Sequence, residues 1–575
     1  MKTWTHLFYA GALCLLMVAC QPKEIEVRLA DYLQDVQSDQ DATPAFRAAI
    51  EACRQQGATR LVIGPGTYRL FPNLAEEKYL FVSNNDPSLK RILFNLSGMH
   101  NLEIDGEGAL LLFSGYITPF LFDKSQHISV KNLSIDYTRT FHTEGTIVAS
   151  GPGWVDLSIP AAFPYRVTNG RMEGCDAYGN SYPFVNMLEF DAVLREPALY
   201  ASDYWLPSDS TPIEERPDGS VRVFGNQLKG TVGNTMVLGA SKRLCPGFVV
   251  SDSQDIKLTD VNIYHCGGMG VIAQRSRDIT LTNVNVVPAP NSGRMISITA
   301  DATHFSNCGG DIQIINCTFT NQKDDATNIH GIYAAVTQID TASNSILVKL
   351  MHDAQWGFDF IQPGNTLEFV NQANLITFHE GVVKHVQRLN KEYTRVEMEA
   401  ALPTSLAIGN AVAVIDTYPN VLIKGCRFEK NRARGLLLGS RGHIVIEDNF
   451  FHIAGAAILL EGDARYWYEQ SGVRDLIIRN NVFENGNYGY FNWGRACISV
   501  GTGMDQREGS RYHRNLTITG NTFRVFDPRI LNLYCTDSVS FKGNTIERTT
   551  AYSLNPKLVD APAFVQDNCA HVSIE

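Results

Sequence analysis

Three aspartates stand out because their spacing and side chains fit acid–base chemistry. Asp301 precedes the consecutive pair Asp324 and Asp325 by 23 and 24 residues. Carboxylates that lie close together repel one another, so at least one of them keeps a proton near neutral pH. Hydrolysis of a glycosidic bond uses such a set, since one carboxyl protonates the leaving oxygen while another activates water or attacks the sugar. The three residues could therefore hydrolyse a glycoside if the fold brings them together.

An internal repeat predicts the elements that would position these side chains. The pattern apolar-x-apolar-x-(Asn/Asp/Gly)-x-x-apolar recurs along the chain, and three of its steps measure 23 residues. Its copies begin at residues 128, 256, 279, 312, 421, 444, 476, 516 and 539. The alternation predicts a half-buried strand, and the central polar residue predicts a bend. Units this short must stack on their neighbours, so we predict an all-β fold, a right-handed parallel β-helix (a pectin-lyase-like solenoid).

The solenoid argument places Asp301 beside the Asp pair. Neighbouring rungs lie about 4.8 Å apart, so residues one repeat apart form ladders along the axis. An isolated Asp would more simply be explained as a turn residue that caps backbone amides. A consecutive Asp pair one rung away from a third Asp instead favours a catalytic cluster.

Two stretches interrupt the repeat but still contain strand-like segments. We predict small antiparallel β modules there, at 138–247 and 332–420, since structureless loops of this length are uncommon in compact domains. The second module begins directly after the Asp pair, and we expect it to form a wall of the active site. The rest divides into an N-terminal cap helix with the first rungs (21–137), the central rungs with the carboxylates (248–331) and the C-terminal rungs (421–575).

The N-terminus has two features of its own. Residues 1–20 contain an apolar stretch too short for a membrane span and end in Ala19–Cys20. We predict a bacterial lipoprotein signal, with Cys20 lipidated and the protein anchored to the cell envelope; a plain signal peptide is the alternative. Further on, Ala42–Gly57 predicts a helix with Thr43 as its N-cap, covering the N-terminal end of the stack.

Composition excludes some classes of function. The chain has 60 acidic and 49 basic residues, a net charge of −11, which argues against nucleic-acid binding. The ten cysteines beyond the signal have no zinc spacing and are expected to be buried free thiols. No HExxH or EF-hand pattern occurs, so we expect chemistry without a metal ion or cofactor. The sequence makes no prediction of the oligomeric state.

The stretch Gly293–Gly331, together with Glu461–Gly472 (EGDARYWYEQSG), resembles glycoside hydrolase family 110, the exo-acting α-1,3-galactosidases of gut and marine bacteria. The resemblance covers most of the mature chain. It implies release of galactose from terminal α-galactosyl glycans with inversion, with Asp324 as general acid and with Asp301 and Asp325 as bases that position the water. Polygalacturonases are more distantly similar, since they also place one Asp a rung before an Asp pair. Their Gly-His-Gly and Arg-x-Lys motifs are not recognisable here, so uronate recognition is not carried over.

Further side chains are candidates for binding the sugar, because a site for a neutral sugar needs an aromatic face and polar groups directed at hydroxyls. The candidate substrate-binding residues are His304, His330, Arg294, Trp467, Glu469 and Asp463, with Trp356 as a weaker one. Two other classes of function stay open. A polysaccharide lyase would use a base such as Lys323, and a non-catalytic glycan-binding solenoid would have no clustered carboxylates.

Overall fold

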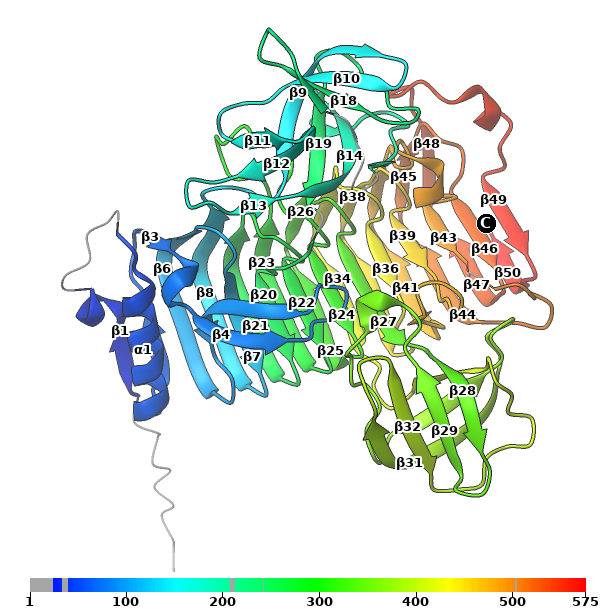
Figure 1. Ribbon diagram of the computed structural model, residues 1–575. Coiled ribbons are helices and arrows are strands. Elements are labelled where there is room, and N and C mark those ends of the chain that lie inside the picture. The colour runs from blue at the N-terminus through cyan, green and yellow to red at the C-terminus, as the bar shows by residue number, and fades with distance from the viewer. Residues whose placement is uncertain (1–23, 34–39, 207–212, 241, 502–503) are drawn as a thin grey trace, which may run out of the picture.

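The computed structural model describes residues 24–33, 40–206, 213–240, 242–501 and 504–575. Most of them form a parallel β-helix whose coils follow one another from the N-terminal helix to the C-terminus, with two inserted β modules (Figure 1). Within the described ranges, the coils contribute a 20-stranded and a 13-stranded sheet. The predicted fold class is therefore confirmed. The predicted signal, including Cys20, lies outside the described residues, and no described helix is long and apolar enough to span a membrane.

The repeat sets the register of the coils. Ile256 in β21 (Gln254–Ile263) lies opposite Ile279 in β23 (Arg277–Val286), which is the 23-residue step. The register survives the second insertion, because Ile312 pairs with Val421, 109 residues later. The chain thus leaves the solenoid for the insertion and returns to the equivalent position on the next coil.

The central polar residue of the repeat forms a buried ladder in the C-terminal coils. Asn449 donates from Nδ2 to Oδ1 of Asn481 at 3.0 Å, and Asn481 and Asn521 repeat this contact with Asn521 and Asn544 at 2.9 Å. Each amide has a partner one coil away, so polar groups at these bends are satisfied inside the protein. The last position of the repeat packs rings into a column of Phe428, Phe451, Phe483 and Phe523.

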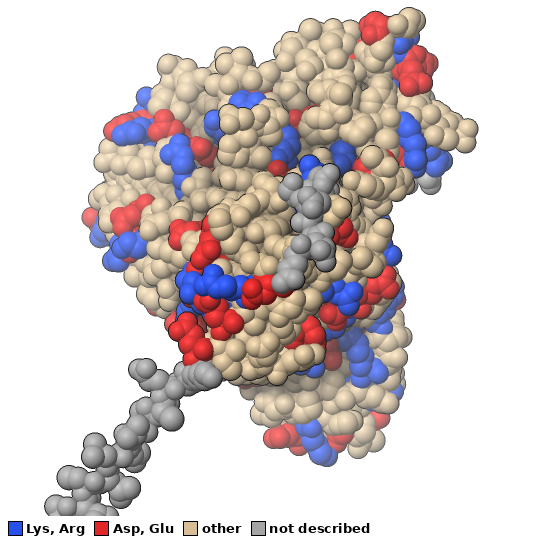
Figure 2. All heavy atoms as spheres, turned by 90° about the vertical axis from the view of Figure 1, so that its left-hand side faces the viewer, with Lys and Arg blue, Asp and Glu red and all other residues tan. Residues whose placement is uncertain are grey.

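Helix α1 (Thr43–Gln56) covers the N-terminal end of the stack (Figure 1). Its N-cap is Ala42 and not Thr43, because the Thr43 hydroxyl donates to the Phe71 carbonyl at 3.1 Å and accepts the Phe71 N–H at 3.0 Å. Gly57 ends the helix with a φ of 61°, in the left-handed region that favours glycine. On this end of the molecule, basic and acidic side chains adjoin one another instead of forming separate patches (Figure 2).

The first insertion is an antiparallel sheet that stands on the solenoid at the top of Figure 1. Its main strands are β9 (Thr143–Gly151), β10 (Trp154–Ser158), β14 (Phe184–Asp191), β18 (Val221–Phe224) and β19 (Thr235–Ala240). It has a small core of its own, built around side chains such as Val155, Met187 and Leu238. The first insertion is therefore a β module with its own packing.

The second insertion is a closed antiparallel barrel at the lower right of Figure 1. Its strands are β28 (Ala334–Asp340), β29 (Ser345–Lys349), β30 (Thr366–Val370), β31 (Thr377–Arg388), β32 (Tyr393–Met398) and β33 (Ala411–Val414). A buried ion pair joins barrel to solenoid, since Glu368 accepts from Nη1 and Nη2 of Arg441 at 3.0 and 2.7 Å.

Candidate active site

The structure brings the three predicted aspartates together at one edge of the solenoid. Asp301 precedes β24 (Thr303–Ser306), and the Asp pair lies between β26 (Thr318–Thr320) and β27 (Thr327–Ile332). Thr303 lies opposite Thr327, so Asp301 and Asp325 occupy equivalent positions on neighbouring coils. One carboxylate oxygen of each aspartate lies within 4.8 Å of the other two.

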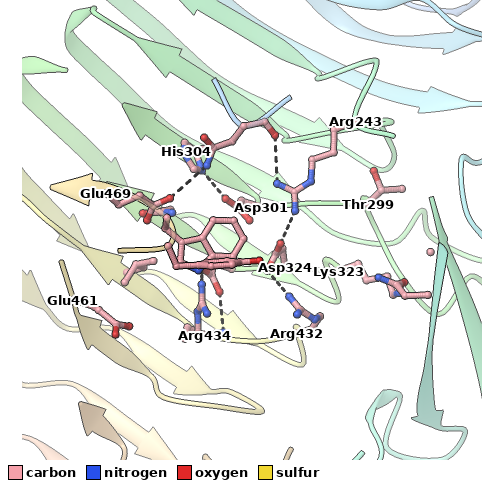
Figure 3. A pocket seen from close by; sticks show the side chains of 18 of the residues that line it. Arg243, Thr299, Asp301, His304, Lys323, Asp324, Arg432, Arg434, Glu461 and Glu469 are labelled. Atoms are coloured by element: carbon pink, nitrogen blue, oxygen red, sulfur yellow. Dashed lines mark hydrogen bonds and ion pairs between the residues drawn. The ribbon is translucent and has the colours of Figure 1, made fainter. Parts of the chain in front are cut away.

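These carboxylates line a cavity of about 880 Å³ (Figure 3). Its walls come from three parts of the chain: the solenoid, the first insertion and the loop 461–469. The first insertion and its exit supply Asn186, Trp205 and Arg243. Of the described residues in 332–420, none lines the cavity, so the expectation that the second insertion walls the site is wrong. That insertion instead contacts two segments that do line the cavity: Gln355 donates to the Trp467 carbonyl at 2.8 Å, and the Asn84 N–H donates to the Ala354 carbonyl at 2.8 Å.

Three guanidinium groups hold two of the aspartates, Asp324 and Asp325. Arg243 Nη2 and Arg432 Nη1 each lie 2.7 Å from a different oxygen of Asp324. Arg434 donates from Nη2 to Asp325 Oδ2 at 2.6 Å, and its backbone N–H donates to Asp325 Oδ1 at 3.0 Å. Both members of the Asp pair therefore have guanidinium partners.

The surroundings separate the pKa values of the three carboxyls. Burial, followed by repulsion from Asp324, raises the pKa of Asp301 to about 7. Burial also raises the pKa of Asp325 to about 7, although Arg434 opposes the shift. Burial alone would raise the pKa of Asp324 too, but Arg432 and Arg243 hold it below its ordinary value. At neutral pH the cluster thus keeps a proton on Asp301 or Asp325 while Asp324 is ionised.

The same carboxylates are near enough to one another to coordinate a cation. Hard cations such as Ca²⁺ need several free oxygen ligands. Here both oxygens of Asp324 and both of Asp325 already accept from arginines, and Asp301 Oδ2 contacts a histidine. This donor set fits guanidinium partners better than a metal ion.

Among the predicted sugar contacts, His304 lines the cavity and His330 lies behind it. His304 Nδ1 is 2.6 Å from Asp301 Oδ2, and its Nε2 is 2.9 Å from His330 Nε2. His330 is buried and does not line the cavity, so its predicted direct contact with the sugar is wrong. Strand pairing explains this, because residues 304 and 330 stand on adjacent coils, with His330 two residues deeper along β27 than the partner of His304.

The loop after β39 (Ile458–Leu460) provides three of the predicted residues at the cavity. Glu469 lies in the two-residue strand β40 (Glu469–Gln470), which pairs with the end of β27. Trp467 is half exposed at the cavity rim. Asp463 also lines the cavity, but its carboxylate accepts the N–H groups of Arg465, Tyr466 and Trp467 at 2.5–2.8 Å. Asp463 therefore shapes the loop that presents Trp467.

Two predicted contacts lie elsewhere. Arg294 forms a bidentate ion pair with Asp136 at 2.5 and 2.8 Å and lines a separate shallow surface pocket. Trp356 packs in the barrel, where its Nε1 donates to Leu350 O at 3.1 Å. Both side chains have partners away from the cavity that the aspartates line.

Sequence reasoning missed the arginines and one aromatic ring. Arg434 follows Asp325 at the equivalent position on the next coil, but the insertion stretches this step to 109 residues and hides it. Arg243 and Trp205 come from the first insertion, whose docking has no repeat to reveal it. Lys323, named only for the lyase alternative, does line the cavity; burial lowers its pKa to about 8, and it contacts Asn186 Oδ1.

Comparisons with known proteins agree with this arrangement. Residues 143–236 match a family model described as GLAA-B beta-barrel domain I, and residues 345–412 match GLAA-B beta-barrel domain II. Residues 407–546 match a right-handed β-helix region, which agrees with the predicted handedness. Among solved structures, an exopolygalacturonase of Thermotoga maritima aligns over 92% of this chain and 93% of its own, with 8% identity and a TM-score of 0.41.

Relatives in sequence are much nearer. Alpha-1,3-galactosidase A of Shewanella woodyi is 36% identical, over 94% of this chain and 89% of its own length. Alpha-1,3-galactosidase B of Bacteroides thetaiotaomicron is 30% identical, over 95% and 90%. With this identity over nearly all of both chains, the protein belongs to the α-1,3-galactosidase family, the glycoside hydrolases of family 110 that its sequence resembles.

Proposed function

We propose that this enzyme removes terminal α-1,3-linked galactose from glycans, of the branched blood-group-B type, the linear type or both. The observation that carries the proposal is the convergence of Asp301, Asp324 and Asp325 on one cavity in a chain so similar to α-1,3-galactosidases. A neutral sugar suits the site. The three central guanidiniums are already paired with carboxylates, so they are not reserved for the carboxylate of a uronate.

The protonation states of the three aspartates support a reaction in which they exchange a proton. In the proposed reaction, Asp324 delivers a proton to the leaving oxygen, and a second aspartate takes a proton from the attacking water. The resting proton lies on Asp301 or Asp325, so one of them must pass it to Asp324 in the substrate complex. Donor and acceptor oxygens within 4.8 Å make this transfer short. The residue that gave up its proton is then the base, and the proton that it takes from the attacking water restores the resting state.

We propose inversion at the anomeric carbon. Carboxyl separations of about 6.5–9.5 Å are usual for inverting enzymes and about 5–5.5 Å for retaining ones. The closest oxygens here lie within 4.8 Å, and a third carboxylate is present, so this two-residue rule does not decide the outcome. The two carboxylates beside the acid can bind and activate a water molecule, which supports inversion.

Exposed rings at the cavity mouth suit the part of the glycan beyond the cleaved bond. Trp205 from β16 (Tyr204–Trp205) is 67% exposed, and Trp467 is 50% exposed. Both line the cavity, from the first insertion and from the loop after β39. Aromatic faces stack on sugar rings, so we propose that these two tryptophans hold the acceptor sugars.

Proton NMR of the first sugar released from a synthetic α-1,3-galactoside tests the proposal. β-Galactose as the first product supports inverting galactosidase activity, whereas α-galactose would replace inversion by retention. No release of galactose would sink the galactosidase proposal. A parallel incubation with a pectin-type polymer tests the lyase alternative, which the buried Lys323 keeps relevant; an unsaturated uronate product would establish it.

We also propose that the enzyme is a lipoprotein anchored to the bacterial cell envelope through Cys20. Support comes from the apolar stretch that ends at Ala19–Cys20. Cys20→Ser should release the protein from the membrane fraction and abolish incorporation of labelled palmitate. A wild-type protein that takes up no label would contradict the anchor.

A further inference from the structure

A buried chain of polar groups leads away from Asp301. Asp301 Oδ2 contacts His304 Nδ1 at 2.6 Å, and His304 Nε2 contacts His330 Nε2 at 2.9 Å. His330 Nδ1 contacts the backbone carbonyl oxygen of Gly331 at 2.7 Å. Asp301, His304 and His330 are all at least nine-tenths buried. The chain therefore begins at Asp301 and His304 in the cavity (Figure 3) and ends at the buried His330, which does not line it.

The far end of the chain fixes the direction of every hydrogen bond in it. A carbonyl oxygen can only accept, so His330 must carry a proton on Nδ1. When His330 is neutral, its Nε2 is an acceptor, so His304 carries its proton on Nε2. His304 Nδ1 is then an acceptor as well, since burial lowers the pKa of His304 to about 3 and keeps the ring neutral. Asp301 Oδ2 must consequently donate, which requires a protonated carboxyl.

We propose that His304 and His330 are positioning residues that form a proton-transfer chain for Asp301. In one state, the proton is on the Asp301 carboxyl and both rings are neutral. In the other, the Asp301 Oδ2–H bond breaks as His304 Nδ1–H forms, and His304 Nε2–H breaks as His330 Nε2–H forms. His330 becomes an imidazolium and Asp301 a carboxylate, with no net change in charge. When Asp325 is protonated as well, Asp301 thus becomes the base while Asp325 supplies the proton that Asp324 delivers. After Asp301 has taken a proton from the attacking water, it passes that proton to Asp325, and the chain reverses to restore the resting state.

The groups around the chain favour this exchange. Glu469 Oε1 lies 3.6 Å from His330 Nε2, and Ser306 Oγ lies 3.2 Å from it, so a positive His330 has polar neighbours. At the other end, the charged groups that face Asp301 are Asp324, Asp325, Arg243, Arg434 and Glu469. His304 faces His330, Glu469, Arg243 and Asp324. The catalytic role of this proton-transfer chain rests on the proposed hydrolysis. The positions of the protons on His304 and His330 do not depend on it.

Nitrogen-15 NMR of the histidine-labelled wild-type enzyme tests the proton positions without any substrate. His304→Asn and His330→Asn spectra assign the signals. We expect a neutral His304 with its proton on Nε2, and a His330 that carries a proton on Nδ1. A neutral His330 protonated on Nε2 alone, or a neutral His304 protonated on Nδ1 beside a neutral His330, would overturn the chain. Neither result depends on which glycoside is cleaved.

Two substitutions of His330 then test its effect on Asp301. Asn can still donate to the Gly331 carbonyl but leaves His304 without its acceptor, so Asp301 should ionise more easily. For His330→Asn we expect the apparent pKa of Asp301 in the pH profile of kcat to fall by about one unit. We also expect kcat to fall about tenfold, with KM nearly unchanged. His330→Gln places an amide oxygen near the position of the lost Nε2. The apparent pKa of Asp301 should therefore stay unchanged, while kcat still falls.

The matched control is His443→Asn, which breaks an exposed histidine–aspartate pair with Asp475 on the solenoid surface. It should leave the pH profile unchanged. If both His330 variants lower only the melting temperature and keep the wild-type pH profile and kcat, His330 is purely structural and the proposal is wrong. Should a variant fail to fold, the wild-type NMR measurement still decides the question.

Discussion

The two insertions leave the same solenoid but serve the active site in different ways. The first one lines the cavity directly with Asn186, Trp205 and the exit residue Arg243. The second one lines none of it within the described residues, yet its side chains hold the neighbouring loop: Gln355 donates to the Trp467 carbonyl at 2.8 Å, and the His352 ring lies 4.6 Å from the Trp467 ring. An insertion can therefore contribute groups to a site or only stabilise the segment that does.

Substitution of a carboxylate on the solenoid should reduce kcat more than any substitution in the two insertions. Asp324→Asn should lower kcat by about 10²–10⁴-fold, because it removes the proposed acid while keeping the side-chain shape. Steady-state kinetics with a natural disaccharide and with an activated aryl galactoside distinguish the roles. An activated leaving group needs no proton, so the variant should lose much less activity on it. Equal losses on both substrates would remove Asp324 as the acid.

The first insertion should show the next largest effect, through Arg243. Arg243→Met removes a guanidinium 2.7 Å from Asp324, so the pKa of Asp324 should rise. An acid must be protonated to act, and its higher pKa therefore moves the alkaline limb of kcat to higher pH. We also expect kcat/KM to fall about 10–100-fold. The control is Arg275→Met, which breaks an ion pair with Asp252 outside the cavity. If the alkaline limb of Arg243→Met stayed at the wild-type pH, the assigned contact between Arg243 and Asp324 would be contradicted.

The cavity rim allows a direct comparison of the two insertions. Trp205→Ala removes a ring of the first insertion, and Trp467→Ala removes the ring supported by the second. Each should raise KM for an oligosaccharide about fivefold to tenfold, with little change for an aryl galactoside that lacks acceptor sugars. Trp356→Ala, in the barrel and away from the cavity, should leave both KM values unchanged. Equal effects on the two substrates would place the rings against the galactose instead.

Substitutions in the barrel should have the smallest effect on turnover, but they can have a large effect on stability. Glu368→Ala leaves Arg441 buried without its carboxylate, so the free energy of unfolding should fall by about 3–5 kcal/mol. Glu397→Ala in the same barrel breaks only the more exposed pair with Lys384 and should cost less than about 1 kcal/mol. Chemical denaturation measures both. If Glu368→Ala abolished kcat in folded enzyme, the second insertion would act on the chemistry after all.

Stability of the barrel junction should also fall in acid. Burial alone would raise the pKa of Glu368, but Arg441 and the hydrogen bonds around it hold that pKa below its ordinary value. A depressed folded-state pKa gives stability that is complete above the unfolded value and is lost as the pH falls through the folded value. The wild type should therefore lose more stability on acidification than Glu368→Ala does, which parallel denaturation series at neutral and acidic pH would reveal.

Periodicity made the solenoid and the aspartate cluster predictable. A 23-residue step fixes which side chains share a face, and Asp301 lies within one step of the Asp pair with no insertion between. Arg434 obeys the same register, but its step contains the barrel, so counting could not find it. Arg243 and Trp205 depend on how a separate sheet docks on the coils, which is a tertiary contact without a sequence period. The N-cap role of Thr43 was also mispredicted, because the Thr43 hydroxyl bonds to the distant backbone of Phe71 instead of capping the helix.

The column formed by Asp301, Asp325 and Arg434 has an evolutionary consequence. Each of these side chains points outward from one coil, while the apolar stack beneath is built by other positions of the repeat. Exchange of a single outward residue can therefore alter the charge order along the axis and leave the hydrophobic interior intact. Because Asp325 and Arg434 form a buried ion pair, such a scaffold acquires new chemistry with little loss of stability when both partners change together.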